Sequence, residues 1–162
     1  MEGFSELAAH VLGTRPQSPF DGRIEPRVLA VRAFPGLDPK LLLGALGAGV
    51  RGMVLEAFGA GNVPHLENSL VPVIEAARAR DVPVVIVSQS ARGAVDLSRY
   101  EGGALAAQAG AISAGDMTPE AALTKLMVVL GRGDSAGAGG RLRVAREGFA
   151  HAWCGEMSEP TT

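Results

Sequence analysis

Residues 81–90 read DVPVVIVSQS, and this stretch decides the fold. Its centre, PVVIV, is an unbroken apolar run rich in β-branched residues, which is typical of a strand that is covered on both faces. Apolar runs at 28–32 and 52–58 predict two more strands, and helical segments lie between the three. Strands that alternate with helices favour parallel pairing and right-handed crossovers. The sequence therefore predicts a three-layer α/β domain with a short parallel sheet, of the Rossmann or flavodoxin-like type.

Capping signals mark where the helices begin. Asp38 and Thr118 each precede a proline at the first helical position, and Asn68 or Ser69 is expected to cap the helix between the second and third strands. Helices are expected at about 40–46, 69–80, 103–109, 118–131 and 142–152.

The first 26 residues differ from the rest of the chain. Three prolines punctuate residues 1–26, which predicts a linker-like segment. We expect one α/β domain at 27–158 and a short tail at 159–162.

Bulk composition excludes several classes of protein. The 162 residues carry a net charge of −2 and scattered basic side chains, which gives no reason to expect nucleic-acid or anionic-membrane binding. Cys154 is the only cysteine, so an intrachain disulfide and a cysteine-rich zinc site are excluded. No run approaches 18 apolar residues, and the N-terminus does not read as a signal peptide. We expect a cytoplasmic protein with no metal and no cofactor.

The loop EAFGAGNVP, residues 56–64, is the first candidate binding element. Gly59 and Gly61 let the main chain approach a ligand, and Asn62 offers both a donor and an acceptor. Ser88, Gln89 and Ser90 end the next strand, and ligands of parallel sheets bind outside the carboxyl ends of the strands. Three interpretations stay open: a phosphate cradle, which the missing third glycine disfavours, a site for another small ligand, or a tight turn.

Candidate catalytic residues are few. The three histidines stand far apart, and none has the spacing of a metal ligand. Asp116 and Glu120 could form a carboxylate pair, but Thr118-Pro119-Glu120 is more simply the start of a helix. An enzyme with unrelated chemistry at Asp96, Tyr100, Asp116 or Glu120 is an alternative that these structural roles disfavour.

Five segments in order resemble the C-terminal domain of L-asparaginases, which also occurs in one subunit of the archaeal glutamyl-tRNA amidotransferase. They are AFPGLDPKLL, GVRGMVLEAFGAGNVP, DVPVVIVSQSARGAVDLSRYEGG, AGAISAGDMTPEAALTKLMVVLG and GEMS. The resemblance covers about residues 27–158 and is greatest to the cytoplasmic branch. It implies amidohydrolase chemistry, in which L-asparagine gives L-aspartate and ammonia.

The resemblance also implies which parts of such an enzyme are missing. The family's nucleophilic threonine lies in an amino-terminal T-G-G-T-I motif, and a T-D pair with a lysine completes the machinery. None of these motifs occurs in this sequence. Whether the chain acts as an enzyme therefore stays open, and we expect it to be inactive alone, with no catalytic residue of its own.

Site residues are assigned by matching the family's motifs. Asn62 occupies the loop asparagine, and Gln89 with Ser90 occupies an S/T-Q-C segment in which Ser90 replaces the cysteine. Glu56 stands where some bacterial members have an arginine and others a glutamate, and a carboxylate there would prefer an α-ammonium group. The residues expected to bind substrate or effector are Glu56, Gly59, Gly61, Asn62, Ser88, Gln89 and Ser90.

The expected partners follow from the absence of the family's amino-terminal catalytic motifs. L-asparagine or a related amino acid is the expected ligand, and a second copy or a separate amino-terminal asparaginase domain is the expected protein partner. An isolated half exposes apolar surface, so we expect a dimer or larger assembly. A non-catalytic amino-acid-binding or regulatory module is the alternative, and truncation of a longer gene would explain the linker-like start.

Overall fold

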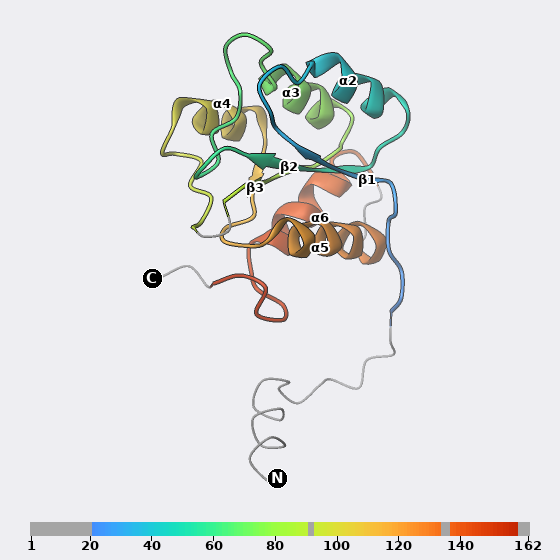
Figure 1. Cartoon of the computed structure of the whole chain (residues 1–162). Helices are drawn as coiled ribbons and strands as arrows, with labels where there is room; N and C mark the ends of the chain where they lie inside the picture. The colour runs from blue at the N-terminus through green and yellow to red at the C-terminus, as the bar shows by residue number, and fades with distance from the viewer. Residues whose placement is uncertain (1–20, 91–92, 134–136, 159–162) are drawn as a thin grey trace.

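The computed structural model describes residues 21–90, 93–133 and 137–158 and is an α/β domain (Figure 1). The strands are β1 (Val28–Arg32), β2 (Gly52–Ala57), β3 (Val84–Ser88) and β4 (Ile112–Ser113). The helices are α2 (Pro39–Gly47), α3 (Val71–Ala79), α4 (Glu101–Ala109), α5 (Pro119–Arg132) and α6 (Gly140–Phe149). The predicted fold class is confirmed.

All strand pairs are parallel, and the strands lie in the order β1-β2-β3-β4. Met53 of β2 pairs with Leu29 on one side and Val84 on the other, so β2 and β3 form the centre of the sheet. β3 is buried along its whole length, as its β-branched run predicts. The sequence did not indicate β4, because a strand of two residues has no periodicity to detect.

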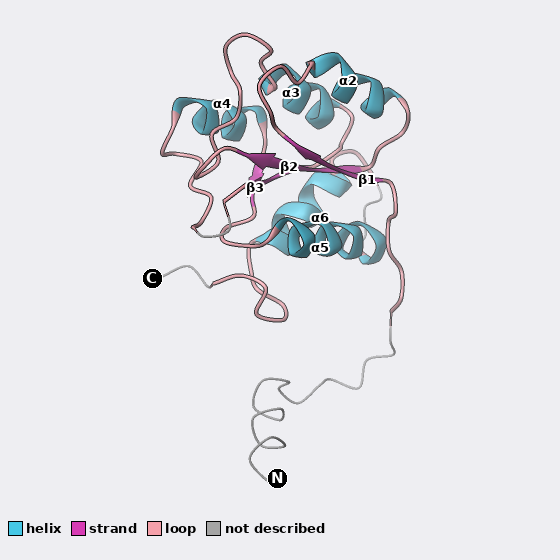
Figure 2. Ribbon diagram, in the orientation of Figure 1, coloured by secondary structure: helices cyan, strands magenta, loops and turns pink. Residues whose placement is uncertain are grey.

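The helices form the two outer layers (Figure 2). α2, α3 and α4 lie on one face of the sheet, and α5 with α6 lies on the other. Along the chain, every strand lies next to the strand before it and always on the same side. Right-handed crossovers therefore place the connecting helices α2, α3 and α4 on one face of the sheet. The layering is that of Rossmann and flavodoxin-like domains, but the strand order does not reverse among the described residues. The described part of the sheet therefore has no crevice at a reversal point, and the loops that leave the carboxyl ends of its strands are the next place to look for a site.

Two of the predicted helix caps are confirmed. The Asp38 carboxylate accepts a 2.9 Å hydrogen bond from the main-chain N–H of Lys40, and the Thr118 hydroxyl accepts one of 3.2 Å from Ala121. Each satisfies an N–H group that has no partner inside its helix.

The predicted cap of α3 is wrong. The helix begins at Val71, and its cap is Leu70, which makes no side-chain hydrogen bond. Leu70 is buried in the core, and Asn68 takes a φ of 55°, so the chain turns before it reaches the helix. The Ser69 hydroxyl lies 3.3 Å from the Val71 N–H and contributes from outside the cap position.

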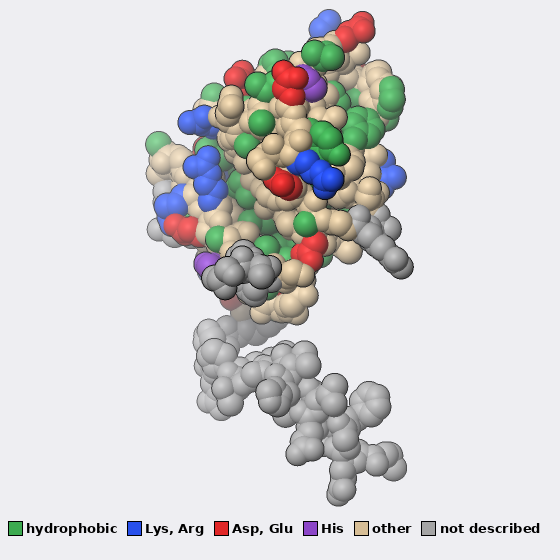
Figure 3. All heavy atoms as spheres, turned by 90° about the vertical axis from the view of Figure 1, so that its left-hand side faces the viewer, with side chains coloured by type: hydrophobic (Ala, Val, Ile, Leu, Met, Phe, Trp, Pro, Cys, Tyr) green, Lys and Arg blue, Asp and Glu red, His purple; other side chains and the backbone are tan. Residues whose placement is uncertain are grey.

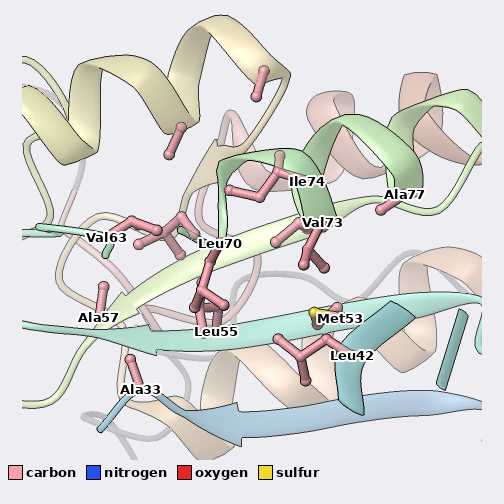
Figure 4. Packing of buried hydrophobic residues seen from close by; sticks show 14 of the residues in the cluster. Ala33, Leu42, Met53, Leu55, Ala57, Val63, Leu70, Val73, Ile74 and Ala77 are labelled. Carbon is pink, nitrogen blue, oxygen red and sulfur yellow. The ribbon is translucent and has the colours of Figure 1, made fainter. Parts of the chain in front are cut away.

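Alternate residues of each central strand pack into two separate cores. Met53 and Leu55 of β2 face α2, α3 and α4, while Val54 faces α5 and α6. Figure 4 shows the first core, where Met53 and Leu55 lie beneath Val73 and Leu70. The sheet is therefore covered on both faces, and the loops that leave the ends of its strands remain open to solvent.

The segment before β1 lies against α5. The main-chain N–H of Glu25 donates to the Met127 carbonyl at 2.9 Å, and Arg23 donates to the Arg132 carbonyl at 3.4 Å. Most of the predicted linker and the whole tail lie outside the described residues. The division into 1–26, 27–158 and 159–162 therefore stays a prediction.

Candidate functional site

The carboxyl ends of β1, β2 and β3 meet at one edge of the sheet, which faces the viewer in Figure 3. The described parts of the loops that leave these ends are residues 33–38, 58–70, 89–90 and 93–100. Hydrophobic and charged side chains lie side by side on this face. The seven predicted binding residues all belong to this edge.

Glu56 forms an ion pair at the end of β2. Its Oε2 accepts a 2.8 Å hydrogen bond from Arg32 Nε and lies 2.7 Å from Arg32 Nη2. The Glu56 side chain is 15% exposed and the Arg32 side chain 62% exposed, so the cation is the more accessible partner. The edge therefore presents a carboxylate beside a guanidinium, which together match the two charges of an α-amino acid.

Gln89 ties the three strand ends together. Its side-chain Nε2 donates to the carbonyls of Ala33 at 2.6 Å and Glu56 at 2.9 Å. Its main-chain N–H donates to the Ala57 carbonyl at 3.0 Å. Gln89 thus fixes the loop after β3 to the ends of β1 and β2.

Ser88 and Ser90 hold the neighbouring loop. The Ser88 hydroxyl donates to the Gly59 carbonyl at 2.6 Å and accepts from the Ser90 N–H at 2.9 Å. These bonds use the Ser88 hydroxyl to shape the main chain. Contact between these serines and a ligand stays a prediction.

The two loop glycines have different surroundings. Both have positive φ, 51° at Gly59 and 103° at Gly61. A Cβ atom at Gly61 would lie 2.8 Å from Val95 Cγ1, whereas none at Gly59 would meet another atom within 4 Å. Gly61 is therefore required for conformation and packing, and Gly59 faces open space from which a ligand could approach.

Asn62 lines a hollow of about 270 Å³ between the loops that follow β1 and β2. Its side-chain amide forms no hydrogen bond with any residue that the structure describes. The lining includes Phe34, Leu37, Phe58, Val63, Pro64, His65, Leu66, Glu67 and Asn68. An unused amide at the wall of an otherwise largely apolar hollow can recognise one polar group of a small ligand or partner.

His65 connects the hollow to α4. Its Nδ1 lies 3.3 Å from the Val63 carbonyl, and its Nε2 lies 3.6 Å from a carboxylate oxygen of Glu101. On the rim of the hollow, Leu66 is 80% exposed and Phe34 52% exposed. His65, Leu66 and Phe34 were not predicted from the sequence as site residues. The sequence alone does not distinguish an apolar loop side chain that enters the core from one that faces solvent.

The alternative catalytic carboxylates have structural partners. Hydrogen bonds from the Ser98 side chain and N–H lower the pKa of Asp96, and those from Ser158 lower the pKa of Asp116. A general acid at neutral pH needs the opposite shift. Neither carboxylate is arranged for proton donation.

The described residues also lack several kinds of centre. In the ranges 21–90, 93–133 and 137–158, no three His, Cys, Asp or Glu side chains gather as a metal site. None of the helices in these ranges is long and apolar enough to span a bilayer. None of the described hydroxyl groups is hydrogen-bonded to a histidine, the arrangement that commonly activates a nucleophile.

Fold and site together define a parallel α/β domain whose strand-end loops carry the candidate binding residues. Residues 27–138 match the family described as Glutaminase/Asparaginase C-terminal domain. The chain belongs to this family, as its sequence motifs predicted.

Named relatives agree with this assignment. The chain is 47% identical over 112 residues to an L-asparaginase of Thermococcus kodakarensis, a match that covers 69% of this chain and 34% of that protein. It is 36% identical over 140 residues to a subunit of the glutamyl-tRNA(Gln) amidotransferase of Methanothermobacter thermautotrophicus, covering 86% of this chain and 30% of the relative.

Solved structures share the fold. The thermostable L-asparaginase from Thermococcus kodakarensis superposes with a TM-score of 0.78 and 37% identity, over 91% of this chain and 43% of that one. L-asparaginase I from Vibrio cholerae gives a TM-score of 0.72 and 32% identity, over 89% and 42% of the two chains. The chain thus spans about a third of the curated relatives and less than half of the solved ones.

Proposed function

We propose that this chain is the C-terminal domain of an asparaginase-type amidohydrolase, which converts L-asparagine to L-aspartate and ammonia. The observation that carries the proposal is the 47% identity to an L-asparaginase over a match that covers only 34% of that enzyme. The folded unit is residues 27–158, the catalytic residues belong to an amino-terminal domain, and this chain alone is inactive. Resemblance to the cytoplasmic branch supports a cytoplasmic location.

The chemistry of the described residues supports inactivity. Hydrolysis of an amide through a covalent intermediate needs a hydroxyl that a neighbouring base activates. The Ser88 hydroxyl binds the Gly59 carbonyl, and the Thr118 hydroxyl accepts from a helix N–H. Neither hydroxyl is hydrogen-bonded to a base among the described residues, which supports a nucleophile supplied by another domain.

Amino-acid binding without catalysis is the second candidate function. The amide of Asn62 could bind a polar group of the ligand in the hollow. Glu56 and Arg32 do not line that hollow, and they offer a carboxylate and a guanidinium for the two charges of an amino acid elsewhere on the same edge. The Arg32 side chain is largely exposed and the Glu56 carboxylate is largely buried, so a ligand ammonium group that replaced Arg32 would keep this carboxylate paired. Asn62 is the residue on which this function depends most directly.

Calorimetric titration with L-asparagine separates the two functions. We expect no ammonia release from L-asparagine by the purified chain. If the second function holds, saturable binding is expected, and Asn62→Ala should weaken it about tenfold, the value of one well-placed hydrogen bond. L-aspartate and L-glutamine test which side-chain group is recognised.

Gln108→Ala is the matched control, because it removes an exposed amide from the outer face of α4. It should leave binding unchanged. Lack of binding at millimolar L-asparagine would contradict the second function. The proposal that this chain is the C-terminal domain of an asparaginase-type enzyme would then remain. Ammonia release by the isolated chain would overturn the proposal that it is inactive alone.

The protein partner is proposed to contact the rim of the hollow. Leu66 and Phe34 expose apolar surface there, and burying a leucine side chain contributes about 1.5–3 kcal/mol. A second copy or the amino-terminal domain would cover this rim. Relatives named as a subunit of an amidotransferase support association with other chains.

Light scattering measures the association. We expect the purified chain to form a dimer or larger assembly, and Leu66→Glu to weaken that assembly more than tenfold because it places a charge in the contact. Leu41→Glu is the control, since Leu41 is also exposed but lies on α2, outside the hollow. A monomer at high concentration, or equal effects of both variants, would refute the rim as the contact.

A further inference from the structure

The last described residues form a strap, defined as residues 150–158, which follows α6. In Figure 1 the strap lies below α5 and runs toward the side on which the strands end. It contains the GEMS motif, residues 155–158, to which neither the fold nor the proposed site assigns a role. The strap is held at two places, and each of them has specific chemistry.

The first attachment is Lys125 of α5, whose side chain is only 3% exposed. Its ammonium group donates to the His151 carbonyl at 2.6 Å and to Glu156 Oε1 at 2.5 Å. The same nitrogen lies 5.5 Å from the centre of the Phe149 ring and 5.1 Å from that of Trp153. Carboxylate, carbonyl and two aromatic faces thus surround one buried cation.

The second attachment is Asp116, just beyond β4. The main-chain N–H of Ser158 donates to Asp116 Oδ1 at 2.8 Å, and the Ser158 hydroxyl donates to Oδ2 at 2.6 Å. Met157 packs against the core beneath α5 and α6, between the two attachments. The end of the strap is therefore fixed to the edge of the sheet.

The segment around Asp116 supports the glycine loop in turn. The carbonyl of its neighbour Gly115 accepts a 2.8 Å hydrogen bond from the Val95 N–H, and the Ser113 hydroxyl donates to the Val95 carbonyl at 3.0 Å. The next N–H, that of Asp96, donates to the Ala60 carbonyl at 3.0 Å. Val95 also packs against Gly61.

We propose that Asp116 and Ser158 are positioning residues, which hold the glycine loop of residues 59–62 in its binding conformation through Val95 and Asp96. The ligand role of this loop rests on the proposed function, but the positioning itself does not. The GEMS motif, through Ser158, thereby helps to fix the geometry of the candidate site, although it lies at the C-terminal end of the domain's sequence.

Hydrogen exchange of individual amides tests the positioning directly. Ser158→Ala should speed exchange at Val95, Asp96 and Asn62 about tenfold, since it removes a hydrogen bond to a charged group. Amides of β2 and β3 should keep their wild-type rates. Asp116→Asn, which retains the shape of the side chain, should act in the same direction.

Thr124→Val is the control, because it removes a hydroxyl that binds only main-chain carbonyls of its own helix. It should leave the loop amides unchanged. Faster exchange of strap amides alone would overturn the proposal, and so would a uniform rise that includes β2 and β3, which indicates only lower global stability. Because no ligand takes part, failure of this test is distinct from failure to bind L-asparagine.

Discussion

Replacement of Gly102 by alanine is expected to destabilise the domain by about 3 kcal/mol and to lower the Tm by about 10 °C. Gly102 lies in the first turn of α4 and is buried. A Cβ atom there would lie 2.1 Å from the Val63 carbonyl oxygen, and close to the Asn62 and His65 side chains as well. A main-chain carbonyl cannot rotate away as a flexible side chain can. Either α4 or the loop that carries Asn62 must therefore move.

Thermal unfolding followed by circular dichroism measures this effect. Gly44→Ala is the matched control, since Gly44 lies inside α2 and a Cβ atom there meets nothing within 4 Å. The control is expected to be more stable than wild type by about 0.5–1 kcal/mol, because alanine has the higher helix propensity. If Gly102→Ala matched the control, the close contact between α4 and the loop would be refuted.

Gly102 also shows why one helix boundary could not be read from the sequence. The sequence predicted this helix at about 103–109, and glycine disfavours helices. The helix starts at Glu101, since both glycines allow α4 to approach the loops beside it. Tertiary packing overrides local propensity at this point.

Other parts of the fold depend on local signals and were predictable. The run Val84–Val87 is buried on both faces of the sheet, and both Asp38 and Thr118 cap helices as their neighbouring prolines indicated. Strand order was not predictable in the same way. It depends on which crossovers cover which face, and no local pattern encodes it.

In the candidate site, too, the positions of residues were predictable from local sequence, whereas their long-range contacts were not. Loop positions at the carboxyl edge follow from the strands, so Asn62 and Gln89 were expected there. Whether their side-chain amides already form hydrogen bonds depends on carbonyl groups far away in the sequence. The Gln89 amide binds the carbonyl of Ala33, 56 residues earlier in the chain, while the Asn62 amide has no partner among the described residues.

The burial and ion pair of Lys125 were the features least predictable from the sequence. In the segment AALTKLMVVL it has the place of an ordinary charged residue on an amphipathic helix. The structure buries it beneath the strap, where Glu156 compensates its charge. The partner lies 31 residues away, beyond the reach of helical periodicity.

Replacement of Glu156 by alanine is therefore expected to cost about 3–5 kcal/mol of unfolding free energy, the range for a buried ion pair that loses one partner. The variant leaves the Lys125 ammonium group buried without its carboxylate. It also removes the acceptor for the N–H groups of Trp153 and Cys154. Urea unfolding at neutral pH measures the loss.

Two further variants separate the buried charge from other causes. Lys125→Met combined with Glu156→Gln should be less damaging than Glu156→Ala alone, because no uncompensated charge remains and the glutamine oxygen can still accept from the strap. Glu147→Ala, which breaks an exposed pair with Arg143 on α6, should change stability by less than about 0.5 kcal/mol. A double variant as unstable as Glu156→Ala would mean that the buried charge is not the cause.

The pH dependence of the same variant provides an independent check. Burial acts to raise the pKa of Glu156, but hydrogen bonds from Lys125, Cys154 and Trp153 outweigh burial and lower the pKa from 4.5 to about 2. The folded protein therefore binds the proton less tightly than the unfolded chain does. The carboxylate's contribution to stability is complete above about pH 4.5 and is lost as the pH falls through about 2. The stability difference between wild type and Glu156→Ala should narrow over this interval, whereas a difference that stays constant down to pH 2 would show that the carboxylate's charge does not hold the strap.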